Sequence, residues 1–260
     1  MKINYSYHTH TALCGHAVGE MTEYVQHAID CGIIRMGFSD HVPYPFDDAG
    51  GRGTRMLSSE AYGYVADIRR LRELYKNKID ILIGFELEYY PEKFQSMLEY
   101  VKKLGAEYII LGQHYMRGIY TGGYHVINGK ATEQDLINYV RELISAMESG
   151  VFTYIAHPDM INFNGNEALY EREMRKLCIA SKRTNIPLEI NGQGIRENRI
   201  YPAERFWKIA GEVGCPVTVG FDSHNAVVSG DNITGARAQQ LVDKYNLNYI
   251  GEPKIIRIDK

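Results

Sequence analysis

The sequence lacks long apolar runs, closely spaced cysteines and an excess of charge of one sign. No apolar stretch approaches the roughly 18 residues that a membrane-spanning helix needs, so we expect no membrane segment. Residues 1–7 have no basic flank followed by an apolar run, so we expect no signal peptide. A net charge of −3 offers no electrostatic attraction to nucleic acid or to an anionic membrane. We therefore expect neither as a partner.

Cysteine is scarce, and the four that occur have no CxxC spacing: Cys14, Cys31, Cys178 and Cys215. This pattern is typical of reduced thiols in a cytoplasmic protein. Cys14 lies among histidines and could bind a metal, but we interpret it as a buried or half-buried free thiol. No feature of the sequence selects an oligomeric state.

Short β-rich runs alternate with longer stretches of helical period along the whole chain. Seven strands are expected, at Ile3–Tyr7, Ile34–Ser39, Ile79–Glu86, Tyr108–Leu111, Phe152–Ala156, Pro187–Ile190 and Pro216–Gly220. The helices expected between and after them are Met21–Cys31, Ser59–Asn77, Pro91–Leu104, Glu133–Ser149, Ala168–Thr184, Pro202–Val213 and Thr234–Tyr245. Because composition does not change along the chain, we expect one α/β domain over residues 1–260 with a mainly parallel sheet. An open doubly wound sheet is the alternative, but no GxGxxG or Walker loop is present, and we favour a closed or nearly closed barrel.

Several helix ends have local signals. Thr132 is expected to cap the helix that starts at Glu133, with Asp135 in its first turn. Pro91 and Pro202 suit a first helical position. Glycines expected just beyond helix ends are Gly32, Gly105, Gly150 and Gly214.

Six of the seven expected strands are followed or ended by residues that commonly bind metals. These residues are His8, His10, His16, His41, Glu86, His114, His157, Asp222 and His224. In a parallel barrel the C-terminal ends of the strands converge on one face, so we expect these side chains to lie together. His8 and His10, like Asp222 and His224, are two residues apart and can point the same way from extended backbone.

Two histidines do not follow this rule. His27 falls inside an expected helix, and we interpret it as structural or solvated. His125 lies in the long Tyr115–Ala131 connection, where it could touch a substrate.

Nine donors exceed the need of one ion, because a catalytic zinc takes about three protein ligands. With one bridging carboxylate they suffice for about three divalent ions, and mixed imidazole and carboxylate ligands suit Zn, Mn or Fe. Three such ions carry about +6, and Glu86 with Asp222 carries −2, which leaves about +4. So positive a pocket predicts an anionic substrate, above all a phosphate ester.

Taken together, the motifs are similar to those of the PHP (polymerase and histidinol phosphatase) family over nearly the whole chain. They are His8-Thr9-His10, Cys14-Gly15-His16, Ser39-Asp40-His41, Gly84-Phe85-Glu86, Gly112-Gln113-His114, Ala156-His157-Pro158-Asp159 and Gly220-Phe221-Asp222-Ser223-His224. The resemblance implies a distorted (β/α)7 barrel with all nine family ligand positions filled. It also implies three groups of ligands: His8, His10, Glu86 and Asp222 for one ion, Glu86, His114 and His157 for a second, and His16, His41 and His224 for a third.

Within this family the chain resembles histidinol-phosphate phosphatases of the histidine pathway. The supporting residues are Cys14-Gly15-His16-Ala17, Pro43–Phe46, Arg55-Met56 and Asn191-Gly192-Gln193-Gly194-Ile195-Arg196. The chain departs from many relatives after His-Pro-Asp, where Met160-Ile161-Asn162 replaces a basic residue. The function implied is hydrolysis of L-histidinol phosphate to L-histidinol and phosphate.

Three alternatives stay open at this point. The chain could be a phosphodiesterase or nucleotidase that acts on another small phosphate ester. It could be a proofreading exonuclease module, although it lacks a basic patch and an attached polymerase. It could also be a non-catalytic metal-binding protein, although such a protein would not need so many ligands on one face.

The expected reaction is direct hydrolysis by a metal-activated water. Asp222 is the candidate proton carrier, with its ligand role as the competing explanation. Arg117, Arg196 and Arg55 are candidates to bind phosphate, each with a plain surface arginine as the alternative. The candidate acids for a substrate amine are Glu88, Asp47 and Asp48.

Overall fold

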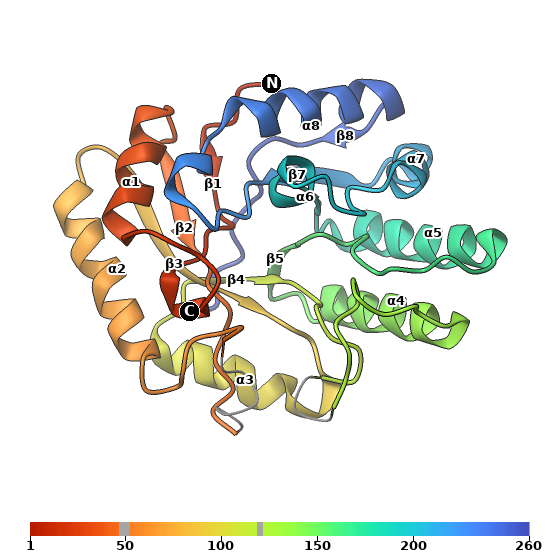
Figure 1. Ribbon diagram of the computed structural model, residues 1–260, viewed down its shortest axis with the longest axis horizontal. Helices are drawn as coiled ribbons and strands as arrows, with labels where there is room; N and C mark the ends of the chain where they lie inside the picture. Colours follow the sequence, from red (N-terminus) through yellow and green to blue (C-terminus); the bar gives the residue numbers. More distant parts are fainter. Residues whose placement is uncertain (47–52, 119–121, 260) are drawn as a thin grey trace.

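Parallel strands lie in sequence order in one strongly curved sheet, and the helices surround it (Figure 1). The computed structural model describes residues 1–46, 53–118 and 122–259. Within these residues the sheet has eight strands: β1 Tyr5–Ser6, β2 Arg35–Phe38, β3 Asp80–Leu87, β4 Tyr108–Leu111, β5 Phe152–Ile155, β6 Leu188–Asn191, β7 Pro216–Gly220 and β8 Asn248–Tyr249. The expected parallel α/β sheet is confirmed, with one strand more than the seven expected.

The α-helices of the described residues are α1 Met21–Asp30, α2 Ala61–Tyr75, α3 Pro91–Leu104, α4 Glu133–Glu148, α5 Glu167–Thr184, α6 Gly192–Arg196, α7 Glu204–Val213 and α8 Asn232–Tyr245. Their local signals act largely as expected. Thr132 and Asp135 form a capping box at α4, and Pro91 is the first residue of α3. Gly105 ends α3 in the left-handed conformation, where glycine has no steric cost. None of the described helices has the length and hydrophobicity that crossing a membrane requires.

Two helix predictions need correction. Pro202 is not the first residue of α7, because Ala203 is the N-cap and the helix begins at Glu204. Ala203 has extended backbone, and its N–H donates to the Asp159 carboxylate. This contact keeps Ala203, and Pro202 before it, outside the helix. The short helix α6 was not expected; Asn191 caps it by accepting a hydrogen bond from Gly194 N.

The first and seventh strands meet just beyond their C-terminal ends. His10 N donates to Ser223 O at 2.9 Å, and Ser223 N donates to His8 O at 3.1 Å. Thr9 and Ser223 thereby form a parallel bridge, which curls the sheet into a barrel-like shape. β8 pairs with β7 through only two residues, too few for a periodic sequence signal, and this explains why it was not expected.

Aromatic side chains fill the interior of the sheet. Tyr108 on β4 is fully buried, and its hydroxyl donates to Tyr7 O at 2.9 Å. Gly37 and Gly84 leave the space that this ring occupies, because a Cβ at either position would overlap it. The interior is therefore a packed core and leaves no channel along the Tyr108 ring.

The last residues of the chain cover the N-terminal ends of the strands. Tyr7 donates its hydroxyl proton to Glu252, and Arg35 pairs with the same carboxylate at 2.6 Å. Further along, Ile258 N donates to Glu107 O at 3.1 Å. Because this end is covered, the opposite end is where a ligand can enter.

Replacing Gly84 with alanine tests the role of Tyr108 in the core. The added methyl group would overlap the Tyr108 ring, and such overpacking costs about 1–3 kcal/mol. We expect Gly84→Ala to lower the free energy of unfolding by that amount in urea titrations followed by circular dichroism. Gly63→Ala is the matched control, because Gly63 lies in α2 with open space around it and should be neutral or stabilising. Equal stability of both variants would contradict this packing.

Candidate active site

A cavity of about 300 Å³ opens at the C-terminal ends of the strands. Eight of the nine candidate ligands line it: His10, His16, His41, Glu86, His114, His157, Asp222 and His224. The other lining residues are Gly53, Thr54, Arg55, Tyr115, His125, Met160, Gln193 and Arg199. The ninth, His8, is fully buried directly below, against Glu86 and Asp222. The predicted convergence of these residues on one face is therefore observed.

The Glu86 carboxylate, at the end of β3, lies at the centre of this cluster. Its Oε1 faces three imidazoles: His157 Nε2 at 3.0 Å, His114 Nε2 at 3.4 Å and His8 Nε2 at 3.5 Å. Its Oε2 faces two others: His41 Nδ1 at 3.0 Å and His10 Nε2 at 3.5 Å. Each oxygen thus has its own set of nitrogen atoms, an arrangement that suits a carboxylate bridging two cations.

Asp222 is the second central acid. Its Oδ1 lies 3.3 Å from His10 Nε2, 3.4 Å from His8 Nε2 and 3.3 Å from His224 Nδ1. The backbone of Asp222 has φ 49° and that of His157 φ 31°, a region that non-glycine residues enter at a cost of about 1–3 kcal/mol. Such strain is retained where surrounding contacts fix the chain, so both residues are held firmly in place.

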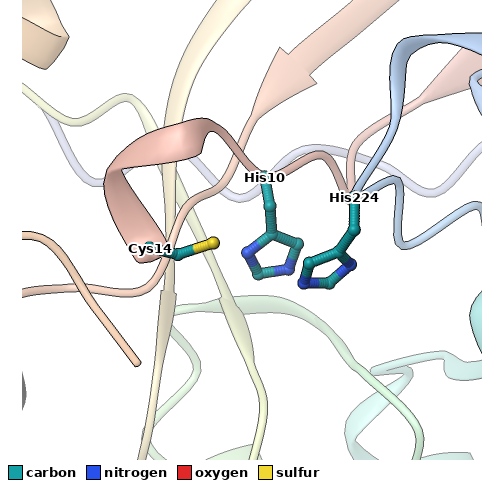
Figure 2. Close-up of side chains that lie close together, drawn as sticks. All are labelled: His10, Cys14 and His224. Atoms are coloured by element: carbon teal, nitrogen blue, oxygen red, sulfur yellow. The ribbon is translucent and has the colours of Figure 1, made fainter. Parts of the chain in front are cut away.

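A third group of donors lies at the open side of the cavity. The ligand atoms of His16, His41 and His224 are within 4.8 Å of one another. His16 Nδ1 is 3.0 Å from Cys14 O, to which it can donate, and this leaves Nε2 to face a ligand. Cys14 lies on the 3-10 helix Ala12–Cys14, buried, with its sulfur directed toward the His10 ring (Figure 2). The donor atoms of His10, Cys14 and His224 also lie within 4.8 Å of one another.

Buried atoms without hydrogen-bond partners indicate what this cluster binds. Within the described residues such atoms include His8 Nε2, Glu86 Oε2, Asp222 Oδ1 and His224 Nε2. Buried polar atoms are nearly always satisfied, so a group of unsatisfied acceptors that face one another calls for a cation. Imidazole and carboxylate donors fit Zn, Mn or Fe and do not fit a calcium site.

The electrostatics of the cluster agree with this. Burial raises the pKa of Glu86, but His114, His41 and His8 outweigh it and hold the pKa well below its ordinary value. Likewise burial lowers the pKa of His8, yet Asp222, Glu189 and Glu86 together keep it well above its ordinary value. Burial raises the pKa of Asp222 too, but His8, His10 and His224 outweigh it and hold the pKa well below its ordinary value. Both central carboxylates are therefore ionised at neutral pH, and metal binding would release protons from the imidazoles.

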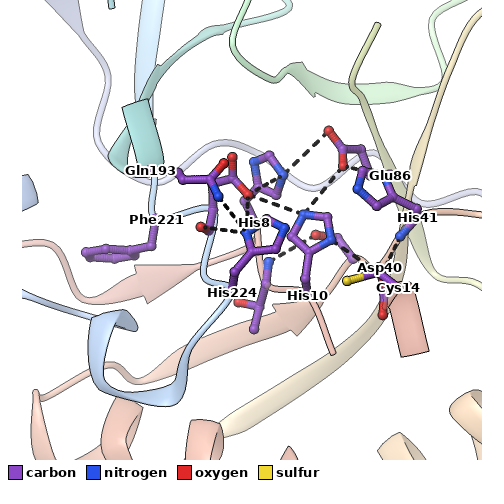
Figure 3. A network of polar contacts seen from close by, with 12 residues as sticks. His8, His10, Cys14, Asp40, His41, Glu86, Gln193, Phe221 and His224 are labelled. Atoms are coloured by element: carbon purple, nitrogen blue, oxygen red, sulfur yellow. Dashed lines mark hydrogen bonds and ion pairs between the residues drawn. The ribbon is translucent and has the colours of Figure 1, made fainter. Parts of the chain in front are cut away.

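Three buried acids and one buried amide contact the candidate ligands and hold them in place. The sequence analysis did not predict this supporting role. Glu189 Oε1 is 2.8 Å from His8 Nδ1. Asp40 Oδ1 is 3.4 Å from His10 Nδ1, and Figure 3 shows these two side chains beside each other. Glu88 Oε1 accepts a hydrogen bond from His114 N at 3.1 Å, and Asn191 donates to Asp222 Oδ2 at 3.0 Å. A signal was available for one pair: Glu189 and Asn191 alternate with apolar residues in β6, which places both on one face.

The three candidate phosphate-binding arginines lie in different surroundings. Arg55 lines the cavity, is buried, and pairs with Glu88 at 3.2 Å while stacking on Tyr44. Arg117 is exposed and does not line the cavity. Arg196 also lies outside the cavity lining, because its guanidinium pairs with Asp231 at 3.1 Å and donates to Phe221 O at 2.8 Å and Asp222 O at 3.2 Å. Arg199 lines the cavity and was not expected.

The candidate acids for a substrate amine are also placed. Both Glu88 oxygens are engaged, by Arg55 and the Tyr44 hydroxyl on one side and by the His114 backbone on the other. Arg55 is the main cause that lowers the Glu88 pKa, to about 2, against the effect of burial. Asp47 and Asp48 lie outside the described residues.

The two remaining histidines separate as expected. His27 lies in α1 with its Nε2 3.4 Å from Cys31 Sγ, away from the cluster. His125 lines the cavity, edge-to-face with Tyr115 at a ring distance of 5.1 Å. Burial lowers its pKa to about 4, so His125 presents a neutral imidazole to the cavity.

The sheet and the donors at its C-terminal end define the class, a parallel α/β protein with a candidate metal centre built from strand ends. The chain belongs to the PHP domain family, whose model matches residues 6–193. The candidate ligands Asp222 and His224 follow the matched segment.

Two curated relatives and one solved structure are similar to this chain. A probable histidinol-phosphatase of Deinococcus radiodurans is 28% identical over 227 residues, which cover 84% of this chain and 85% of the relative. The histidinol-phosphatase of Bacillus subtilis is 22% identical over 250 residues, covering 84% and 92%. Histidinol phosphate phosphatase from Lactococcus lactis, solved with zinc, L-histidinol and phosphate, has the same fold with a TM-score of 0.74 at 18% identity, over 100% of this chain and 99% of that one.

The placement of Arg196 predicts a structural effect of its removal. Arg196→Gln would leave Asp231 without its cationic partner and the Phe221 and Asp222 carbonyls with fewer donors, which costs about 1–3 kcal/mol. We expect a loss of that size in urea unfolding. Exposed Arg237 on α8 provides the control, and Arg237→Gln should change stability by less than about 0.5 kcal/mol. Unchanged stability of Arg196→Gln would show that these contacts contribute little.

Proposed function

We propose that this protein is a divalent-metal-dependent phosphomonoesterase that hydrolyses L-histidinol phosphate to L-histidinol and phosphate. The observation that carries the proposal is the convergence of seven imidazoles on two buried carboxylates in and below one cavity. The relatives named as histidinol-phosphatases support the choice of substrate.

About three ions would be held by the groups that the motifs imply. His8, His10, Glu86 and Asp222 would hold one ion, Glu86 with His114 and His157 a second, and His16, His41 and His224 a third. The two separate nitrogen sets around Glu86 support its bridging role, and the close grouping of His16, His41 and His224 supports the third site. When bound, these ions supply a nucleophilic water at neutral pH and positive charge for the phosphoryl oxygens.

The buried supporting acids change the charge of the site. Asp40 and Glu189 lie within hydrogen-bonding distance of candidate ligands and add −2 to the −2 of Glu86 and Asp222. Against about +6 from three divalent ions, the site would therefore carry less positive charge than the +4 expected from the sequence. The remaining charge suits an anionic phosphate ester, and the relatives named as histidinol-phosphatases favour a monoester.

Residues of the chain would position the substrate. Arg55 lines the cavity and can supply positive charge toward a phosphoryl oxygen. Arg199 stands at the same cavity and can supply a second guanidinium. The rings of Tyr115 and His125, with Met160, form a wall that suits the imidazole of histidinol.

Asp222 is the residue that would move a proton. Asn191 holds its Oδ2, while Oδ1 lies among the imidazoles at the cavity floor. A carboxylate fixed in this way can carry a proton to the oxygen of the leaving alcohol.

Loss of single candidate ligands tests the metal mechanism. We expect His114→Ala and Asp222→Asn each to lower kcat by at least about 10³-fold, since each removes a donor from the cluster that binds the reacting group. Metal content measured by mass spectrometry should fall in parallel. His27→Ala, a histidine far from the cavity, should keep both activity and metal. Near-normal turnover in either ligand variant would remove this mechanism.

Substrate identity is tested by phosphate release from L-histidinol phosphate beside other phosphomonoesters, nucleotides and diesters. We expect a preference for L-histidinol phosphate that a chelator abolishes and that Zn or Mn restores. Chelator-sensitive activity on a different ester would keep the metal site and reject the substrate. Metal binding without any hydrolysis would instead support a non-catalytic role.

A further inference from the structure

Glu189 is a buried acid that the proposed chemistry does not use directly. It lies in β6, is fully buried and does not line the cavity. Its carboxylate nevertheless reaches two candidate ligands from behind. Oε1 is 2.8 Å from His8 Nδ1, and Oε2 accepts the backbone N–H of His157 at 2.9 Å.

Asn191 extends this contact to a third candidate ligand. The two residues are on the same face of β6, and the Asn191 amide donates to Glu189 Oε2 at 2.8 Å and to Asp222 Oδ2 at 3.0 Å. The amide oxygen accepts from Gly194 N at 2.9 Å, so its orientation is fixed by the cap of α6. Glu189 and Asn191 together therefore touch groups that belong to two of the proposed ion sites.

The neighbouring strand leaves room for this acid. A Cβ at Gly220 on β7 would overlap Glu189 Oε1, so only glycine at that position permits the carboxylate to reach His8. The backbone of His157, which Glu189 holds, has φ 31°, a strained value for a residue with a side chain. Both features show a carboxylate fitted into place by its surroundings.

We propose that Glu189, aided by Asn191, is a positioning residue that fixes the ligands of two metal ions in their relative positions. By accepting the His8 Nδ1–H bond it fixes the tautomer that presents Nε2 to the cavity and makes that nitrogen a stronger donor. By accepting the His157 N–H bond it fixes the strained turn that directs His157 toward Glu86. This inference rests on the proposed metal site but not on the identity of the substrate.

The test is metal binding by Glu189→Gln, measured without substrate. Glutamine keeps the shape but replaces one acceptor with a donor, so either the His8 or the His157 contact is lost. We expect the dissociation constants of two ions to rise together, by about 10–100-fold, in competition with a graded chelator. The visible spectrum of the cobalt-loaded protein should change, and kcat should fall with little change in KM.

Asn191→Ser is the second variant, for the case in which Glu189→Gln does not fold. Serine can still cap α6, but its shorter side chain does not reach Asp222 Oδ2, so we expect a smaller loss of affinity that is greatest for the ion held by Asp222.

Glu107→Gln is the matched control. Glu107 is a buried acid near the opposite end of the sheet, where it pairs with Arg72 and Arg257. Its loss should lower stability without changing metal affinity or the cobalt spectrum.

Wild-type metal affinity and an unaltered cobalt spectrum in folded Glu189→Gln would overturn the proposal, as would an equal loss of affinity in Glu107→Gln. Failure of the proposed function gives a different result. In that case the wild type binds metal and loses it in Glu189→Gln as expected, but does not hydrolyse L-histidinol phosphate.

Discussion

The Glu86 carboxylate and the five imidazoles around it are the interaction on which the rest of the structure depends. An isolated ionised acid at 2% exposure would be very costly, and its negative charge is tolerated because nitrogen atoms of His8, His114 and His157 face one oxygen and those of His10 and His41 the other. These five residues come from four different strands or the turns that follow them. The curvature of the sheet is thus coupled to the geometry of one carboxylate.

Two buried acids near that centre, Glu189 and Asp40, each contact two candidate ligands. Glu189 touches His8 and the His157 backbone, while Asp40 lies 3.4 Å from His10 Nδ1 and accepts the His41 N–H at 2.7 Å. Each acid therefore joins two candidate ligands that follow different strands. Such sharing makes the cluster cooperative, because displacement of one ligand disturbs the support of another.

Much of this could be predicted from the sequence, for a physical reason. Ligands such as His41 and His157 follow apolar strands, so the strand signal also gives their position, and Thr132 and Pro91 mark helix starts through local chemistry alone. Glu189, Asp40 and Arg196 were missed or misassigned because their partners are far away in the chain. The three-residue motif around Asp40 does not reveal that the acid supports His10, and Arg196 looks like any loop arginine until α8 brings Asp231 beside it. The two residues of β8 are too few for periodicity to detect.

The bridge between Thr9 and Ser223 has a consequence for synthesis on the ribosome. The first candidate ligands emerge early, but the strand that fixes them against Asp222 and His224 is made more than 200 residues later. A nascent chain therefore carries exposed histidines without the acid that completes their site, and full metal affinity arises only when most of the protein has been translated. Products truncated before β7 would lack Asp222 and His224, and with them part of the centre.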